Sequence, residues 1–181
     1  DEVVGEAATK VFEDAQEMLK DIVEQRWLQA NAVIGFWPAN TVRDDDIELY
    51  ADESRRDVVL TWHGLRQQTE KQNDAQGNLR PSQCLSDFIA PRGPSEPNPK
   101  ADYIGMFACT AGIGAKEKID EFMAANDDYS AIVFEALSDR LAEACAEWLH
   151  WRVRTDLWGF APDEDFTVEE LIAEKYQGIR P

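Results

Sequence analysis

The feature that most constrains the fold is a long helical periodicity between about residues 129 and 158. Apolar side chains recur there at steps of three and four residues, which is the spacing of one face of an α-helix. The pattern therefore predicts one long helix with a core-facing side. The residues expected on that side are Val133, Leu137, Leu141, Ala144, Trp148 and Trp151.

Three further helices are expected. Apolar residues recur with the helical period over about residues 5–27, and a shorter helix is expected over about 116–125. Thr167 followed three residues later by Glu170 forms a capping-box pattern, which predicts a last helix that begins after Thr167.

Short extended segments lie between the helices. The ranges that favour strands are 32–37, 46–50, 58–62 and 103–109. A turn is expected at 38–40, and a loop through Gly112 and Gly114 is expected to follow the last strand. The second and third ranges are separated by a short polar run and predict an antiparallel hairpin.

The order of these elements bounds the fold class. Helices and strands are mixed without a βαβ alternation, and no internal repeat is visible. We therefore expect an α+β fold with a twisted antiparallel sheet and flanking helices. A length of 181 residues suits one domain or at most two small ones, and we expect a single domain that spans residues 1–181.

Charge and cysteine content exclude several classes of partner. The formal net charge is −18, which would repel a phosphate backbone, so nucleic acid is not an expected partner. No apolar run reaches the roughly 18 residues that cross a bilayer, so no membrane is expected. Three cysteines at wide spacing are typical of reduced thiols in a cytoplasmic protein.

The sequence contains no stand-alone catalytic motif of the hydrolase, phosphate-binding, metalloprotease or dinucleotide-binding kinds. His63 and His150 have no ligand-type neighbour at the spacing of a zinc site, so no metal is expected on this chain. No residue is therefore assigned a catalytic role.

An acidic row follows the long helical pattern at steps of four residues. Its members are Glu135, Asp139, Glu143 and Glu147. Like charges at this spacing repel one another by roughly 0.2–0.5 kcal/mol per pair. A solvated helix face with nearby arginines explains the row most simply. A surface that receives a cation or an imidazole remains the alternative.

Whole phrases of the chain resemble cobalamin-dependent methionine synthase. They occur in the same order as in that family and cover nearly the whole chain. The phrases include Asp1-Glu2-Val3-Val4-Gly5, Pro38-Ala39-Asn40, Leu65-Arg66-Gln67-Gln68-Thr69-Glu70-Lys71, Cys84-Leu85-Ser86-Asp87-Phe88, Ala136-Leu137-Ser138-Asp139-Arg140-Leu141-Ala142-Glu143-Ala144 and Tyr176-Gln177-Gly178-Ile179-Arg180-Pro181.

The part of that enzyme with these phrases is its C-terminal activation, or reactivation, domain. The resemblance implies a C-shaped domain that binds S-adenosylmethionine and docks on the cobalamin module for reductive methylation of cob(II)alamin. Flavodoxin or a methionine synthase reductase would supply the electron. The whole enzyme would be a methyltransferase of methionine biosynthesis, with its zinc, folate and cobalamin sites on other modules. Positioning the two reactants is the main task, so no general base is needed.

The resemblance also assigns roles to single residues. Arg180 matches the arginine that meets the carboxylate of S-adenosylmethionine through charge-assisted hydrogen bonds. Glu143 and Glu174 match acids near the same pocket, although salt bridging on a helix surface explains them equally well. Asp139 and Arg140 match a pair that docks on the cobalamin module and on the histidine released from cobalt.

The ends of the chain suggest an excised segment. It starts without Met and stops one residue after Arg180, so the Gly-Tyr-Pro part of the family motif is absent. We expect a partial domain that is not active alone. The alternative is a non-catalytic interaction module of the same fold, which docks on a corrinoid protein or a reductase without binding the nucleoside.

Overall fold

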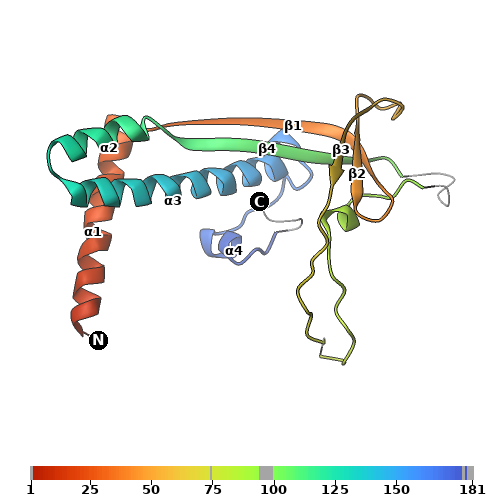
Figure 1. The fold of residues 1–181 in the computed structure, drawn as a ribbon, viewed down its shortest axis with the longest axis horizontal. Helices are drawn as coiled ribbons and strands as arrows, with labels where there is room; N and C mark the ends of the chain where they lie inside the picture. The colour runs from red at the N-terminus through yellow and green to blue at the C-terminus, as the bar shows by residue number, and fades with distance from the viewer. Residues whose placement is uncertain (1, 74, 94–99, 177, 179–181) are drawn as a thin grey trace. The chain divides into compact units, whose positions relative to one another are not determined.

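The computed structural model describes residues 2–73, 75–93, 100–176 and 178. It divides into two compact units, which are described separately. The first unit combines Asp1–Val33 with Ala108–Pro181, and the second unit is Ile34–Phe107. Figure 1 shows the elements in their order along the chain.

The helices belong to the first unit: α1 (Glu2–Gln25), α2 (Ala115–Ala124), α3 (Asp128–Arg152) and α4 (Val168–Ile172). All four predicted helices are confirmed. The Asp127 side chain accepts a hydrogen bond from the Ser130 amide and caps α3, and the Thr167–Glu170 capping box opens α4. α2 and α3 form a hairpin, and α1 packs across the early turns of α3 (Figure 1).

The long helix ends earlier than its periodicity predicts. The α-helical geometry stops at Arg152, and the next five residues form a π-helical turn, η2 (Val153–Leu157). The Trp158 amide donates to the Val153 carbonyl at 2.9 Å, which is the wider five-residue hydrogen bond of a π-turn. The apolar spacing continues through this turn, so periodicity alone could not place the boundary.

Three aromatic rings form the centre of the first unit. Phe134 of α3 is fully buried, and its ring lies 6.0 Å from the rings of Trp27 and Phe122, measured between centroids. Trp27 and Phe122 meet edge to face at the same distance. The Lys118 Nζ atom lies 4.0 Å from the centre of the Trp27 ring and adds a cation–π contact. Phe122 lies in α2, Phe134 lies in α3, and Trp27 follows the end of α1, so the cluster connects these three helices.

The glycine before α2 is required by a close approach. Gly114 has a φ angle of 96°, and a Cβ atom at this position would lie 2.7 Å from the Trp27 carbonyl oxygen. Both the left-handed backbone and the lack of space favour glycine. Gly114 thus lets the strand before α2 turn next to the aromatic cluster.

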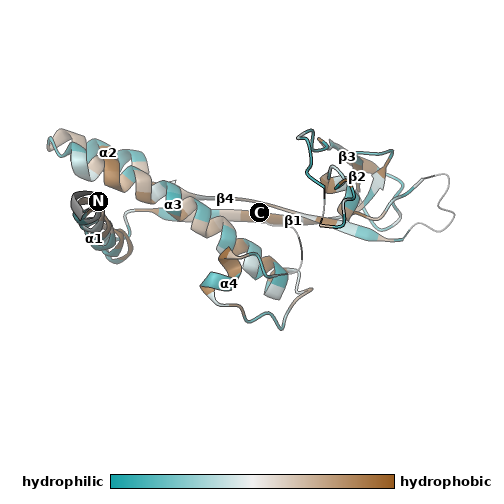
Figure 2. Ribbon diagram, turned by 90° about the horizontal axis from the view of Figure 1, so that it is seen from below, coloured by the Kyte–Doolittle hydropathy of each residue, from teal (hydrophilic) through white to brown (hydrophobic). Residues whose placement is uncertain are grey.

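The core-facing side expected for α3 is only partly correct. Val133 is buried as predicted, but Ala144 is exposed and Trp148 is 53% exposed. The residues of α3 that are buried are Ala131, Val133, Phe134, Ser138 and Leu149. Figure 2 shows polar and apolar residues alternating along the whole of α3. The prediction failed because the sequence of one helix does not reveal which apolar side its neighbours cover.

The strands form one sheet in the order β3-β2-β1-β4. Their bounds are β1 (Gln29–Val42), β2 (Asp46–Tyr50), β3 (Val58–His63) and β4 (Asp102–Ile113). β2 pairs antiparallel with both β1 and β3, with Ala39 opposite Leu49 and Ile47 opposite Trp62. The predicted hairpin and the α+β class with an antiparallel sheet are confirmed.

Two local expectations at the long strands are wrong. The turn expected at 38–40 is part of β1, and the loop expected at Gly112 is part of β4, which continues to Ile113. Pairing with β2 begins at Ala39, so the missing N–H of Pro38 removes no hydrogen bond from that ladder. Of the two glycines in the predicted loop, Gly112 lies in β4 and Gly114 lies in a turn.

The core of the second unit lies on the paired strands β1 and β2. Ala39, Ile47 and Leu49 are buried together, with Trp37 and Trp62 packed against them. No helix in the described part of the chain is long and apolar enough to span a membrane. The C shape expected for the whole domain concerns the arrangement of the two units and stays a prediction.

Candidate functional site

The acidic row on α3 lies on the protein surface. Its four members are all exposed: Glu135, Asp139, Glu143 and Glu147. The Arg140 Nη2 atom lies 2.9 Å from the Glu143 Oε1 atom, and both side chains are more than half exposed. An exposed pair of this kind contributes about 0–1 kcal/mol to stability. The row is therefore free to meet a partner at little cost to the fold.

The other expected site residues lie near the end of the chain. Glu174 is exposed and follows α4, with a left-handed φ angle of 55°. After it the Lys175 amide donates to the Glu170 carbonyl at 3.1 Å, which closes a turn against α4. Arg180 lies outside the described residues. Of the expected set, the structure thus pairs Arg140 with Glu143 and places Glu174 in a separate segment of the same unit.

The structure reveals a buried cluster that sequence reasoning missed. Arg154 of η2 is only 1% exposed, and its Nε atom donates to the Glu164 carboxylate at 2.8 Å. Its Nη1 atom lies 2.7 Å from the Nδ1 atom of His150, one turn earlier in α3. The guanidinium also lies 4.0 Å from the centre of the Tyr176 ring. We call these four residues the Arg154 clamp.

Part of this cluster had a visible signal in the sequence. His150 and Arg154 are four residues apart on the long helical pattern, a spacing at which side chains meet. Glu164 and Tyr176 follow in irregular segments where no periodicity relates them to the helix. Only the tertiary fold brings them to the guanidinium.

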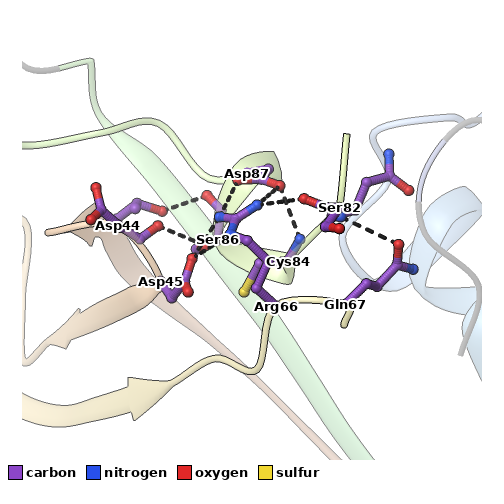
Figure 3. A network of polar contacts seen from close by, with 10 residues as sticks. Asp44, Asp45, Arg66, Gln67, Ser82, Cys84, Ser86 and Asp87 are labelled. Carbon is purple, nitrogen blue, oxygen red and sulfur yellow. Dashed lines mark hydrogen bonds and ion pairs between the residues drawn. The ribbon is translucent and has the colours of Figure 1, made fainter. Parts of the chain in front are cut away.

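A second polar network ties down a loop of the second unit (Figure 3). The Arg66 guanidinium donates to the carboxylates of Asp45 and Asp87 at 2.6–2.9 Å and to the Ser82 carbonyl at 2.8 Å. The bonds from Arg66 to Asp87, together with one from the Cys84 amide, lower the pKa of Asp87 to about 2. One arginine thus anchors the start of the segment that follows β3.

Gly64 shows how tightly this loop approaches the sheet. A Cβ atom on Gly64 would lie 2.5 Å from the Sγ atom of Cys84 and 2.6 Å from the Asp45 carbonyl oxygen. Cys84 is buried, as expected for a small apolar side chain. The phrases around Arg66 and Cys84 therefore meet in space, although about 18 residues separate them in the chain.

The first unit also contains an apolar hollow of about 370 Å³. Ile22, Leu28, Leu141 and Trp148 line it, and Arg26 is the only charged residue among the described residues of its lining. A charged amino-acid ligand needs several polar partners, which this lining does not offer. The hollow is therefore a poor match for such a ligand.

Cysteine thiols and possible metal ligands were also considered in the sequence. Cys84, Cys109 and Cys145 are free. Burial and the neighbouring Cys109 thiol raise the pKa of Cys145, which keeps it protonated. Within the described ranges, no group of three or more His, Cys, Asp or Glu side chains could hold a metal ion.

Comparison with known proteins identifies the family. The family model described as the activation domain of vitamin B12-dependent methionine synthase matches residues 1–181. A solved structure, described as the MetH reactivation domain bound to AdoHcy, is 49% identical in sequence and superposes with a TM-score of 0.83. The match covers 100% of this chain and 52% of the solved chain, so this chain spans about half of that chain's length. The chain belongs to the activation-domain family of vitamin B12-dependent methionine synthases.

Proposed function

We propose that this chain forms part of a surface that binds S-adenosylmethionine for reactivation of methionine synthase. One observation carries the proposal. The solved reactivation domain, which is 49% identical and matches 100% of this chain, was bound to AdoHcy. AdoHcy differs from S-adenosylmethionine only in lacking the methyl group and its sulfonium charge. A surface that holds the adenosine and amino-acid ends of one compound therefore suits the other.

In this proposal, charged side chains hold the amino-acid end of the ligand. Arg180 binds the carboxylate through charge-assisted hydrogen bonds. Glu143 and Glu174 favour the amino group or the sulfonium. The exposure of both carboxylates supports these roles, since each is accessible to a ligand. The overall charge of −18 also favours a ligand with a cationic centre.

The same proposal gives the domain a regulatory part in a larger methyltransferase. Cobalamin, held by the neighbouring module, would supply the nucleophile that accepts the methyl group. The residues of this chain bind and orient the methyl donor, which requires no proton transfer. Flavodoxin or a methionine synthase reductase would deliver the electron. The free cysteines are compatible with the reducing cytoplasm that we propose for the protein.

The proposed binding is tested by isothermal titration of the full-length protein with S-adenosylmethionine and, separately, with AdoHcy. We expect saturable binding of both compounds with a stoichiometry of one. Adenosine alone is the control, because it lacks the amino-acid end that Arg180 is proposed to hold. Absence of heat with both compounds, from protein that is folded by circular dichroism, would contradict the proposal.

We further propose that Asp139 and Arg140 dock on the cobalamin module. Asp139 is exposed on α3, so its carboxylate can face a histidine that leaves cobalt and stabilise it as a cation. Asp139→Asn in the full-length enzyme should shift the population between turnover and reactivation states. The absorbance of bound cobalamin, recorded across pH, measures that population.

The matched control for docking is Glu13→Gln, which neutralises an exposed acid on α1. Both substitutions should change stability by less than about 0.5 kcal/mol, because surface positions tolerate such changes. Only Asp139→Asn should alter the pH profile of the cobalamin spectra. Identical profiles for Asp139→Asn and the wild type would rule out the docking role.

A further inference from the structure

Two of the three cysteines meet within the first unit. Cys109 lies near the end of β4, and Cys145 lies in the second half of α3. Their thiols are in hydrogen-bonding contact. Cys84, by contrast, is buried next to Gly64 in the second unit. The three thiols therefore divide into one pair and one separate residue.

The fold places this pair beside the apolar hollow of the first unit. Alternate residues of a strand point to the same face, so Cys109 shares a face of β4 with the buried Ala111. Ala111 and Cys145 both line the hollow. Leu141 and Trp148, about one helical turn before and after Cys145, line it as well. The two cysteines thus belong to surfaces of a strand and a helix that border the same space.

Both thiols of the pair are partly accessible. Cys109 and Cys145 have intermediate exposure, whereas Cys84 is buried. A small reagent can therefore reach the pair from solvent more readily than it reaches Cys84. A disulfide holds its two sulfur atoms about 2.0 Å apart, and thiols that are already in contact approach this separation without a large movement.

We propose that Cys109 and Cys145 form a site of reversible oxidation, at which a low-molecular-weight disulfide converts the two thiols into one intramolecular disulfide. The Cys109 thiolate attacks one sulfur of the oxidant, whose S–S bond breaks and releases one thiol. The Cys145 thiolate then attacks the Cys109 sulfur and releases the second thiol. Two protein thiols are oxidised and the oxidant is reduced to two thiols, which take up the two protons that the cysteines lose.

The surroundings of Cys145 set the order of the two attacks. Burial and the neighbouring Cys109 thiol raise the pKa of Cys145, so little of it is thiolate at the start and Cys109 attacks first. After this attack Cys109 carries a neutral mixed disulfide and no thiol. Its contribution to the raised pKa of Cys145 then disappears, which favours the second attack.

The new bond joins the end of β4 to α3. This helix also carries the acidic row, whose members Glu143 and Glu147 lie two residues to either side of Cys145. Oxidation therefore fixes the helix that carries the row to a strand of the sheet, and reduction releases it. The pair can close whether or not the chain binds S-adenosylmethionine, so the oxidation site is independent of the proposed function.

The test is thiol mapping of the folded full-length protein after treatment with hydroxyethyl disulfide. This oxidant is uncharged, so the charge of −18 on this chain does not repel it. Remaining thiols are alkylated in denaturant, and trypsin then separates the three cysteines into peptides 72–92, 101–116 and 141–152. We expect peptides 101–116 and 141–152 to be recovered joined and to separate after reduction. Cys84 is the internal control and should be recovered alkylated.

Two variants test the order of attack. In Cys145→Ser no second thiol is available, so a stable hydroxyethyl adduct should accumulate on Cys109. In Cys109→Ser the adduct on Cys145 should form several-fold more slowly, because burial still raises the pKa of Cys145. A faster reaction at Cys145 than at Cys109 would overturn this order.

The wild-type protein decides the proposal without any substitution. Cys109 and Cys145 recovered as alkylated thiols, or as two separate hydroxyethyl adducts, would overturn it. Joined peptides that include Cys84 as often as they include the pair would also overturn it, because such exchange would not depend on the contact between Cys109 and Cys145.

Discussion

Phe134→Ala is expected to lower the free energy of unfolding by about 3–5 kcal/mol, the range for removing a buried phenylalanine. The side chain is fully buried and contacts both Trp27 and Phe122 at the centre of the first unit. Its removal leaves a cavity between α3 and its neighbours. Typical domains have only about 5–15 kcal/mol of stability, so the loss would be a large fraction of the total. Urea denaturation followed by circular dichroism measures it, since the helices lie in the first unit.

The matched control is Phe12→Ala on α1. Phe12 is 64% exposed, so the same truncation should change stability by no more than about 0.5 kcal/mol. The difference between the two variants isolates the contribution of the aromatic cluster. A loss below 1 kcal/mol at Phe134, by the same denaturation measurement, would show that the three rings do not form the core of the unit.

Arg180→Ala is expected to have the largest effect on ligand binding. A hydrogen bond to a charged group contributes about 1.5–3 kcal/mol, which corresponds to roughly a ten- to hundred-fold increase in the Kd for S-adenosylmethionine. Arg180→Lys should fall between the wild type and Arg180→Ala, because lysine keeps the charge but cannot bind a carboxylate in the bidentate manner. Isothermal titration of the full-length variants measures both constants.

Arg43→Ala provides the control for charge. Arg43 is an exposed arginine of the second unit and pairs with Asp46 at 3.2 Å. Removing it changes the net charge by the same amount as Arg180→Ala, so a general electrostatic effect would weaken binding equally in both variants. We expect Arg43→Ala to bind like the wild type. Equal losses would show that Arg180 has no specific contact with the ligand.

The helices and the hairpin could be predicted because local sequence dictates them. The 3.6-residue period located α1, α2 and α3, and the capping box marked the start of α4. Features that depend on neighbours could not be read in this way. Whether Pro38 ends a strand depends on which of its edges is paired, and the exposure of Trp148 depends on where α1 and α2 lie.

In the candidate site, too, the features set by local sequence could be predicted and those that depend on the tertiary fold could not. The acidic row of α3 was visible because its residues recur every four positions on one helix. The Arg154 clamp was not, because Glu164 and Tyr176 reach the guanidinium through irregular segments. The Arg66 network was present in the sequence only as phrases shared with a family. Its physical reason, one arginine that joins two carboxylates, required the fold.

Reductive methylation in the full-length enzyme tests the proposed role in reactivation most directly. Enzyme with cob(II)alamin is supplied with an electron donor and with S-adenosylmethionine labelled in its methyl group. We expect label in methylcobalamin for the wild type and a much slower rate for Arg180→Ala at sub-saturating S-adenosylmethionine. Transfer that proceeds equally in both proteins, or no transfer in the wild type, would contradict it.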